Sequence, residues 1–159
     1  MRVSAVVLAL AALLGPASTL AQQPAQDEVV AVVHRFFDGM RAKDTTALRA
    51  LMHPSGRLLG TGPNREGQLR VEETAMDRFF QMVGSAPGTL DERIWDPEVR
   101  IDGDLATVWT PYAFYFDGNF SHCGVDAFQL ARTAEGWRIV QIADTRRTAG
   151  CPTPPPHAK

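Results

Sequence analysis

The second half of the chain is dominated by strand-like segments that short turns separate. Runs rich in β-branched and aromatic residues occupy residues 92–101, 105–116, 119–133 and 137–147. The turn residues between them are Asp102-Gly103, Asp117-Gly118 and the Ala-Glu-Gly at 134–136. Asp-Gly pairs favour tight hairpin turns. The pattern therefore predicts consecutive antiparallel strands that form a meander.

The first half carries helical patterns instead. Apolar residues recur every three or four positions over residues 27–44 and 71–86, which predicts two amphipathic helices. A shorter helix capped by Asp44 is expected over 45–52, and a short strand over 56–62. Helices followed by a meander predict one α+β domain, with the helices against one face of a curved sheet. The residues expected to cover the concave side of that sheet are Val29, Val33, Phe36, Met40, Phe79, Phe80 and Val83.

The N-terminus has the layout of a secretory signal peptide. One arginine precedes an apolar run at 3–14, and small residues near Ala21 offer a cleavage site. The run is shorter than the roughly 20 residues that a membrane-spanning helix needs. We therefore expect a signal peptide at 1–21, a periplasmic or secreted domain at 22–151, and a disordered Pro-rich tail at 152–159.

The charge balance argues against nucleic acid as a partner. The full chain carries 16 basic and 18 acidic residues. Removal of the predicted signal peptide takes away one arginine, which changes the net charge from −2 to −3. Nucleic-acid-binding domains carry basic patches instead. We expect neither a nucleic-acid partner nor a membrane span.

Several segments resemble the nuclear transport factor 2-like, or SnoaL-like, superfamily. They are the N-terminal helices that end in "RALMHP", the long meander with its "DG" hairpins, "HCG" at 122–124 and "GWRI" at 136–139. These segments are similar to an exported bacterial branch, some of whose members are labelled "putative lumazine-binding". The resemblance covers residues 26–151. It implies a cone-shaped α+β barrel, built from a curved, mostly antiparallel sheet under three N-terminal helices, with an internal pocket and commonly a homodimer.

The resemblance leaves two classes of function open. Ketosteroid isomerases of this superfamily use a carboxylate on the first strand and a tyrosine on the first helix, and both are missing here. The first hypothesis is an exported protein that binds a small molecule in an apolar pocket. The second is a lyase, isomerase or hydrolase. No cofactor is expected for either.

Turn lengths predict which residues share a face of the sheet, because directly opposed residues of a hairpin point the same way. A two-residue Asp117-Gly118 turn sets Phe116 opposite Asn119, and a three-residue loop at 134–136 sets Asp126 opposite Asp144. One face would then carry Trp109, His122, Asp126, Phe128, Leu130, Val140, Ile142 and Asp144. The other would carry Tyr112, Phe114, Cys123, Val125 and Ala127.

The polar end of the first face carries the candidates for catalysis, His122, Asp126 and Asp144. Opposed carboxylates repel each other, so one is expected to keep its proton, and the pKa of His122 beside them is expected above about 6.5. Such a set next to an apolar pocket suits acid–base chemistry. The alternative is a group at a solvated rim whose members satisfy one another. A flat ligand is expected to contact Trp109, Tyr112, Phe128 and Ile142.

The chain has two cysteines. In an exported protein they predict a disulfide between Cys123, on a strand, and Cys151, beyond the last strand. A free nucleophilic thiol at Cys123 is the alternative. No metal site is expected, because the adjacent His122 and Cys123 would point to opposite faces of a strand.

Overall fold

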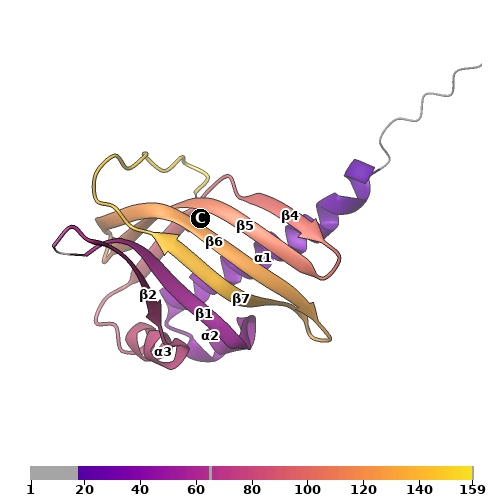
Figure 1. Ribbon diagram of the computed structural model, residues 1–159, viewed down its shortest axis with the longest axis horizontal. Coiled ribbons are helices and arrows are strands. Elements are labelled where there is room, and N and C mark those ends of the chain that lie inside the picture. The colour runs from indigo at the N-terminus through magenta and orange to yellow at the C-terminus, as the bar shows by residue number, and fades with distance from the viewer. Residues whose placement is uncertain (1–17, 65, 159) are drawn as a thin grey trace, which may run out of the picture.

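One strongly curved sheet carries the helices on its concave side (Figure 1). The structure is a computed structural model that describes residues 18–64 and 66–158. The described helices are α1 Ser18–Ala42, α2 Thr45–Leu51 and α3 Met76–Gly84. The described strands are β1 Met52–Pro63, β2 Leu69–Thr74, β3 Leu90–Ile94, β4 Glu98–Asp102, β5 Leu105–Phe116, β6 Asn119–Thr133 and β7 Gly136–Thr145.

The strands are arranged in the order β2-β1-β7-β6-β5-β3, and β4 also pairs with β5. Each neighbouring pair is antiparallel except β1 and β7, which run parallel. The sheet stays open, with β2 at one edge and the short β3 and β4 at the other. The prediction of an α+β domain with a curved, mostly antiparallel sheet is confirmed.

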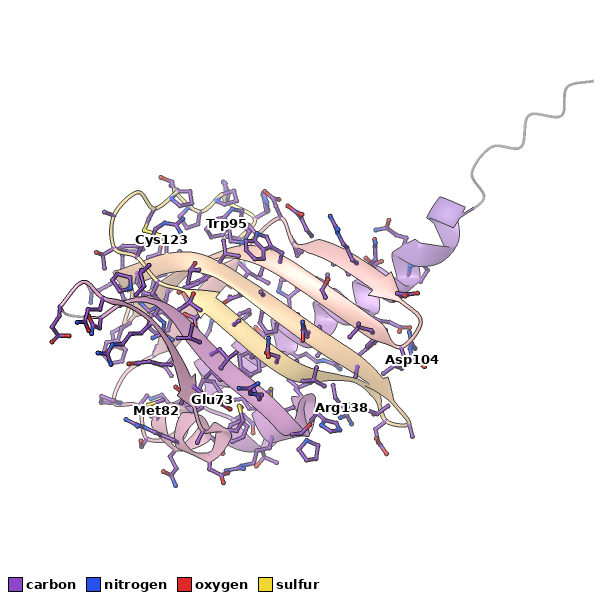
Figure 2. All side chains as sticks on the ribbon, in the orientation of Figure 1. Glu73, Met82, Trp95, Asp104, Cys123 and Arg138 are labelled. Atoms are coloured by element: carbon purple, nitrogen blue, oxygen red, sulfur yellow. A yellow bond between two sulfur atoms is a disulfide. The ribbon has the colours of Figure 1, made fainter. Side chains whose placement is uncertain are left out.

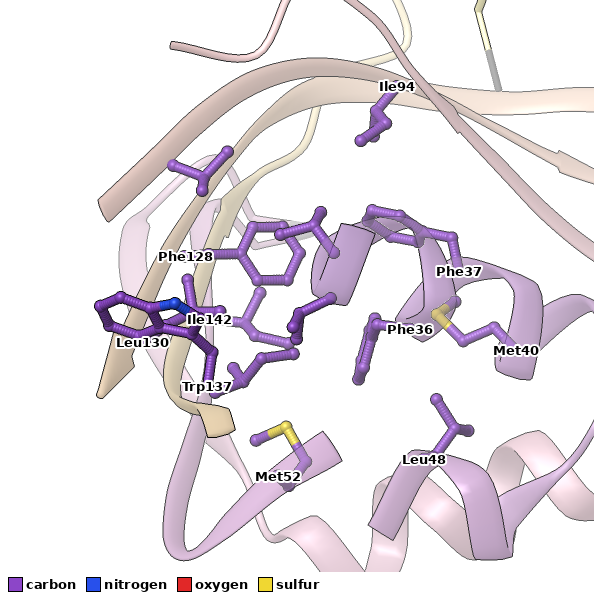
Figure 3. Packing of buried hydrophobic residues seen from close by; sticks show 14 of the residues in the cluster. Phe36, Phe37, Met40, Leu48, Met52, Ile94, Phe128, Leu130, Trp137 and Ile142 are labelled. Atoms are coloured by element: carbon purple, nitrogen blue, oxygen red, sulfur yellow. The ribbon is translucent and has the colours of Figure 1, made fainter. Parts of the chain in front are cut away.

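The core lies between the sheet and α1, which runs across its concave face (Figures 1 and 3). Phe36 and Phe37 of α1 meet the ring of Phe128 on β6 edge-on, at centroid distances of 6.1 and 5.8 Å. The chain turns at Lys43, which has a positive φ, and Asp44 caps α2 by accepting a hydrogen bond from the Ala47 amide at 2.9 Å. The predicted apolar faces of α1 and α3 are both buried.

Two elements differ from the expectation. The predicted helix over 71–86 forms only over α3, because residues 69–74 pair with β1 as strand β2. The run at 92–101 splits into β3 and β4 around Trp95-Asp96-Pro97, where Asp96 has a φ of 46°. A proline cannot donate to a ladder, so a break at this position is favourable.

Two β-bulges change the predicted register. Phe116 pairs with Asn119 as expected across the Asp117-Gly118 turn, but Ser121 is an extra residue on β6. Beyond it Trp109 pairs with Ala127 rather than with Asp126, so the predicted placement of Trp109 beside Asp126 is wrong. The same shift moves Tyr112 and Phe114 to the concave face, opposite to their predicted side. An extra residue in one strand reverses the facing of everything beyond it.

The second bulge restores a predicted pair. The β6–β7 turn is one residue shorter than expected, since Thr133 pairs with Gly136, and Val140 is an extra residue on β7. Leu130 therefore pairs with Ile139 instead of Val140. The shorter turn and the extra residue Val140 offset each other further along the strands. Phe128 therefore faces Ile142 and Asp126 faces Asp144, as predicted.

The predicted Cys123–Cys151 disulfide is present, with 5.8 Å between the Cα atoms (Figure 2). It ties the segment after β7 to β6, and Cys123 also exchanges two backbone hydrogen bonds of 2.9 Å with Arg147.

The tail has no helix or strand between Pro152 and Ala158, and its His157 Nε2 lies 3.2 Å from an Asp96 carboxylate oxygen. Residues 1–17 of the predicted signal peptide lie outside the described residues. Within the described ranges, no helix combines the length and apolar character needed to cross a bilayer.

Candidate functional site

A pocket of about 740 Å³ opens between α1, α3 and the concave side of the sheet. Half of its lining consists of apolar side chains: Phe36, Phe37, Met40, Leu58, Phe79, Met82, Val83, Leu90, Phe114 and Ile142. Charged groups from β2, β3, β6, α3 and the end of β7 complete the lining. Figure 2 labels two of its residues, Glu73 of β2 and Met82 of α3. This volume is in the range of small-molecule sites.

Five carboxyl groups line this pocket, two from β2 and one each from β3, β6 and β7. Asp126 and Asp144 are paired across β6 and β7, and they are only 2% and 6% exposed. Glu92 comes from β3, where it lies between Leu90 and Ile94 on the inward-facing side of the strand. Buried carboxyl groups are rare unless they are paired with a cation or a hydrogen-bond donor.

Glu92 and Asp126 form a carboxyl pair in which each group shifts the pKa of the other. Burial raises the pKa of Glu92 to about 7, although its hydrogen bond with Asp126 opposes this. Burial also raises the pKa of Asp126 well above its ordinary value, and the charge and hydrogen bond of Glu92 raise it further. The hydrogen bond thus favours the protonated form of Asp126 and the ionised form of Glu92, so Asp126 is the donor. Such a pair titrates as a unit.

Asp144 has a different partner. Arg146, two residues further along the chain, donates from Nε to Asp144 Oδ2 at 2.7 Å. The Arg146 side chain is 60% exposed, whereas that of Asp144 is 7% exposed. Although burial lowers the pKa of Arg146, the hydrogen bond and charge of Asp144 raise it above its ordinary value. Asp144 therefore has a cation in direct contact, whereas the charge of Arg146 acts on Asp126 without an ion pair.

Tyr112 is tied to the last residue of β7. Its hydroxyl donates to the backbone carbonyl of Thr145 at 2.8 Å, and burial followed by the charge of Glu92 raises its pKa. The opposed residue on β6 is Gly124. A Cβ there would collide with the Thr145 carbonyl and lie 2.7 Å from the Tyr112 ring. Gly124 thus leaves the space that Tyr112 occupies beside the pocket.

His122 lines the same pocket but does not behave as expected. Its ring packs on Phe114 at a centroid distance of 5.0 Å, and Nδ1 lies 3.0 Å from the Ser121 hydroxyl. Burial and the positive charge of Arg146 lower its pKa, and Asp144 opposes them only in part. The predicted pKa above 6.5 is therefore wrong. Neutral His122 is better placed to exchange hydrogen bonds than to carry a charge.

Only two of the four predicted ligand-contact residues line the pocket. Tyr112 and Ile142 line the pocket. Phe128 is buried in the core against α1, and Trp109 is 52% exposed on the outer face of the sheet with Glu98 and Arg100 nearby. His122, Asp126 and Asp144 do lie in one pocket, and Cys123 forms the disulfide away from it.

Sequence reasoning missed Glu92 and Arg146. Both had a local signal. In "LDERI" the acidic Glu92 alternates with Leu90 and Ile94, which marks a carboxyl on an otherwise apolar strand face. In "DTR" Asp144 and Arg146 are two residues apart, the spacing of same-side neighbours on a strand. Among the described residues no group of three or more His, Cys, Asp or Glu side chains is arranged to hold a metal ion.

Solved structures with the same fold come from several bacteria. An NTF2-like protein from Cytophaga hutchinsonii has a TM-score of 0.64 and 13% identity, over 77% of this chain and 98% of its own. One from Novosphingobium aromaticivorans has a TM-score of 0.63 and 16% identity, over 89% and 94%. A protein from Streptomyces avermitilis, described as a "putative dehydratase" of the NTF2-like family, has a TM-score of 0.61 and 18% identity, over 79% and 99%.

These structural similarities concern the fold, since the identities are low. A comparison with curated proteins found no match. The family model described as "Putative lumazine-binding" matches residues 24–143, which is most of the chain. The chain therefore belongs to the family described as "Putative lumazine-binding", and its fold is the one seen in the NTF2-like structures.

Proposed function

We propose that this protein binds a small, largely apolar molecule in the pocket between α1, α3 and the sheet. One observation carries the proposal: an open pocket of about 740 Å³ has apolar walls and a buried carboxyl oxygen, Asp126 Oδ2, without a conventional hydrogen-bond partner at its floor. An unsatisfied buried polar atom costs about 1–3 kcal/mol. A ligand that meets this atom would recover that free energy, and the apolar walls would bind the rest of the ligand.

The proposal is tested by filling the pocket. Leu58 of β1 lines the pocket, whereas the next residue, Leu59, is absent from the lining and alternates to the other side of the strand. Leu58→Trp should block the site, and Leu59→Trp adds the same ring elsewhere. Native mass spectrometry of protein purified from its own cells should show a retained small molecule in the wild type and in Leu59→Trp, but not in Leu58→Trp. Equal occupancy in all three proteins, or none in any, would contradict the proposal.

Acid–base catalysis is the second candidate, and the Glu92–Asp126 pair favours it. A group with a pKa of about 7 beside a protonated carboxyl can take a proton from a bound molecule and return one. The reaction would be a proton-transfer lyase, isomerase or hydrolase step without a cofactor, with His122 and Asp144 beside the pair. If so, Glu92→Gln should abolish turnover of the ligand found by mass spectrometry and still bind it. Turnover that persists in Glu92→Gln would exclude this role.

We also infer export and self-association. A disulfide is stable in an oxidising compartment, which agrees with the predicted signal peptide and a periplasmic or secreted location. The outer face of the central strands supports a homodimer because its middle is uncharged. This uncharged outer face consists of Thr107, Trp109 and Pro111 of β5, Val125, Ala127 and Gln129 of β6, and Gln141 and Ala143 of β7.

A further inference from the structure

We propose that the ligand carries one basic nitrogen: an apolar amine or amidine whose cationic end lies against Glu92 and Asp126. This inference rests on the proposed binding function and specifies the chemical class of the ligand. It depends on three features of the pocket, namely its charge balance, the unpartnered oxygen at its floor, and the aromatic character of its walls.

The pocket has more carboxyl groups than cations to neutralise them. Of the two arginines in its lining, Arg146 is engaged by Asp144, and Arg78 is exposed at the α3 side of the opening. Glu73 is paired outside the pocket with Arg57 at 2.8 Å. Within the described parts of the chain, neither Glu92 nor Asp126 forms an ion pair with any Lys, Arg or His. An anionic ligand would be repelled at this floor, and a cation would be attracted.

The unpartnered atom specifies what the ligand must bring. Asp126 Oδ2 is buried and has no hydrogen-bond donor from a Lys, Arg, amide or hydroxyl group of the described residues. Its neighbour Glu92 accepts from Asp126, and an ionised carboxylate has room for further donors beside that one. An ammonium group has up to three N–H donors, and an amidinium has several in a plane, so either can serve both carboxyl groups.

The walls suit the rest of such a ligand. Phe36 and Phe79 are stacked with 5.7 Å between ring centroids, and Phe114 and Tyr112 line the opposite, sheet side. These rings bind an apolar body through burial, and aromatic faces also attract a cation. A pocket that combines aromatic walls with an uncompensated carboxyl pair therefore favours a hydrophobic cation over a neutral molecule of the same shape.

Binding of a cation must be linked to proton release. The groups facing the pair are Asp144 of β7 and Arg146 beyond it, His122 of β6 and Tyr112 of β5. From β2 come Glu72 and Glu73, and from α3 comes Arg78, while α1 and β1 contribute only apolar side chains to the lining. A cation beside the pair stabilises the ionised carboxylates, so the affinity for an amine should rise as the pH rises from 6 to 8.

The test compares three probes that share one ring system: 2-naphthylmethylamine, 2-naphthalenemethanol and 2-naphthoate. Isothermal titration calorimetry of the mature protein should show the amine binding at least about tenfold more tightly than the alcohol at pH 8, and the carboxylate most weakly. The amine's advantage should shrink at pH 6. Glu92→Gln and Asp126→Asn should each remove most of this advantage and leave the alcohol's affinity nearly unchanged. Glu98→Gln, on the outer side of β4, should behave like the wild type.

The outcomes separate this inference from the proposed function. If the alcohol binds as tightly as the amine at both pH values, or if the carboxylate binds best, the cationic ligand is excluded and the apolar pocket stands. If all three probes fail to bind, the apolar binding site itself is contradicted as well. If Glu92→Gln fails to fold, Asp126→Asn gives the same comparison from the other carboxyl group.

Discussion

At the residue scale, the carboxyl of Glu92 is the feature that most separates this pocket from an ordinary core. Its pKa is raised from 4.5 to about 7, mainly by burial, and burial together with Glu92 raises the pKa of Asp126 well above its ordinary value. A folded protein that contains carboxyl groups with raised pKa values loses stability at every pH at which the unfolded chain would ionise them. The raised pKa of Glu92 makes folding less favourable at neutral pH. Shifts of this kind are typical of residues at functional sites.

This cost gives a pH-dependent prediction. Below pH 4.5 Glu92 is protonated in both the folded and unfolded states and costs nothing. Between pH 4.5 and 7 the unfolded chain ionises first, so the free energy of unfolding should fall as the pH rises. Glu92→Gln removes the titrating group. Between pH 4 and pH 8 the free energy of unfolding of this variant should therefore rise, relative to that of the wild type, by up to about 3 kcal/mol. Solvent screening of the half-buried side chain reduces this amount. Urea unfolding at both pH values measures it.

A matched substitution provides the control. Glu98→Gln changes the same group at an exposed position of β4 and should leave the pH dependence of unfolding as in the wild type. A wild type and a Glu92→Gln variant with parallel stability profiles would show that Glu92 has an ordinary pKa.

At the element scale, the helices, the meander and the pairing of Asp126 with Asp144 could be predicted from periodicity and turn residues. The bulges at Ser121 and Val140 could not, because a bulge depends on how the sheet must twist around α1 rather than on a local residue pattern. The bulge at Ser121 placed Trp109 outside and Tyr112 inside, so half of the predicted ligand contacts changed sides. Strand β2 was missed because its acidic residues also suit the first turn of a helix.

The disulfide is the element-scale feature with the clearest energetic consequence. It joins residues 28 apart in the sequence and anchors the chain beyond β7, including Arg147, to β6. The double variant Cys123→Ala/Cys151→Ala should lose about 3–4 kcal/mol of unfolding free energy, the amount expected from loop-closure entropy. Urea unfolding measures the loss, and reduction of the wild type should reproduce it. A difference below about 1 kcal/mol would show that the crosslink does not restrict the unfolded chain as proposed.

At the scale of the whole molecule, the two faces of the sheet have different roles. The concave face encloses the core and the pocket, and the convex face presents the uncharged outer face with Trp109 exposed on it. Exposed apolar and uncharged surfaces of this kind mark interaction sites. We infer that a second copy of the chain covers it, which leaves the pocket of each copy open on the other side.

The inferred homodimer predicts a change of mass in solution. Trp109→Glu replaces the exposed ring of the uncharged outer face by a charge and should convert a dimer into a monomer in sedimentation velocity experiments. Phe120→Glu, another exposed aromatic residue but close to the β5–β6 turn, should remain dimeric. A wild-type protein that sediments as a monomer at micromolar concentration would contradict the inferred dimer.

The central claim is that Glu92 and Asp126 share one proton at the floor of a ligand pocket. Carbon-13 NMR of the side-chain carboxyl groups tests it most directly, with Glu92→Gln and Asp126→Asn used to assign the two signals. The structure predicts that the Glu92 signal titrates near pH 7 and that the pKa of Asp126 lies well above that of an ordinary carboxyl group. Two signals that both titrate near pH 4 would contradict the claim, because the pocket would then hold two ordinary, fully ionised carboxylates.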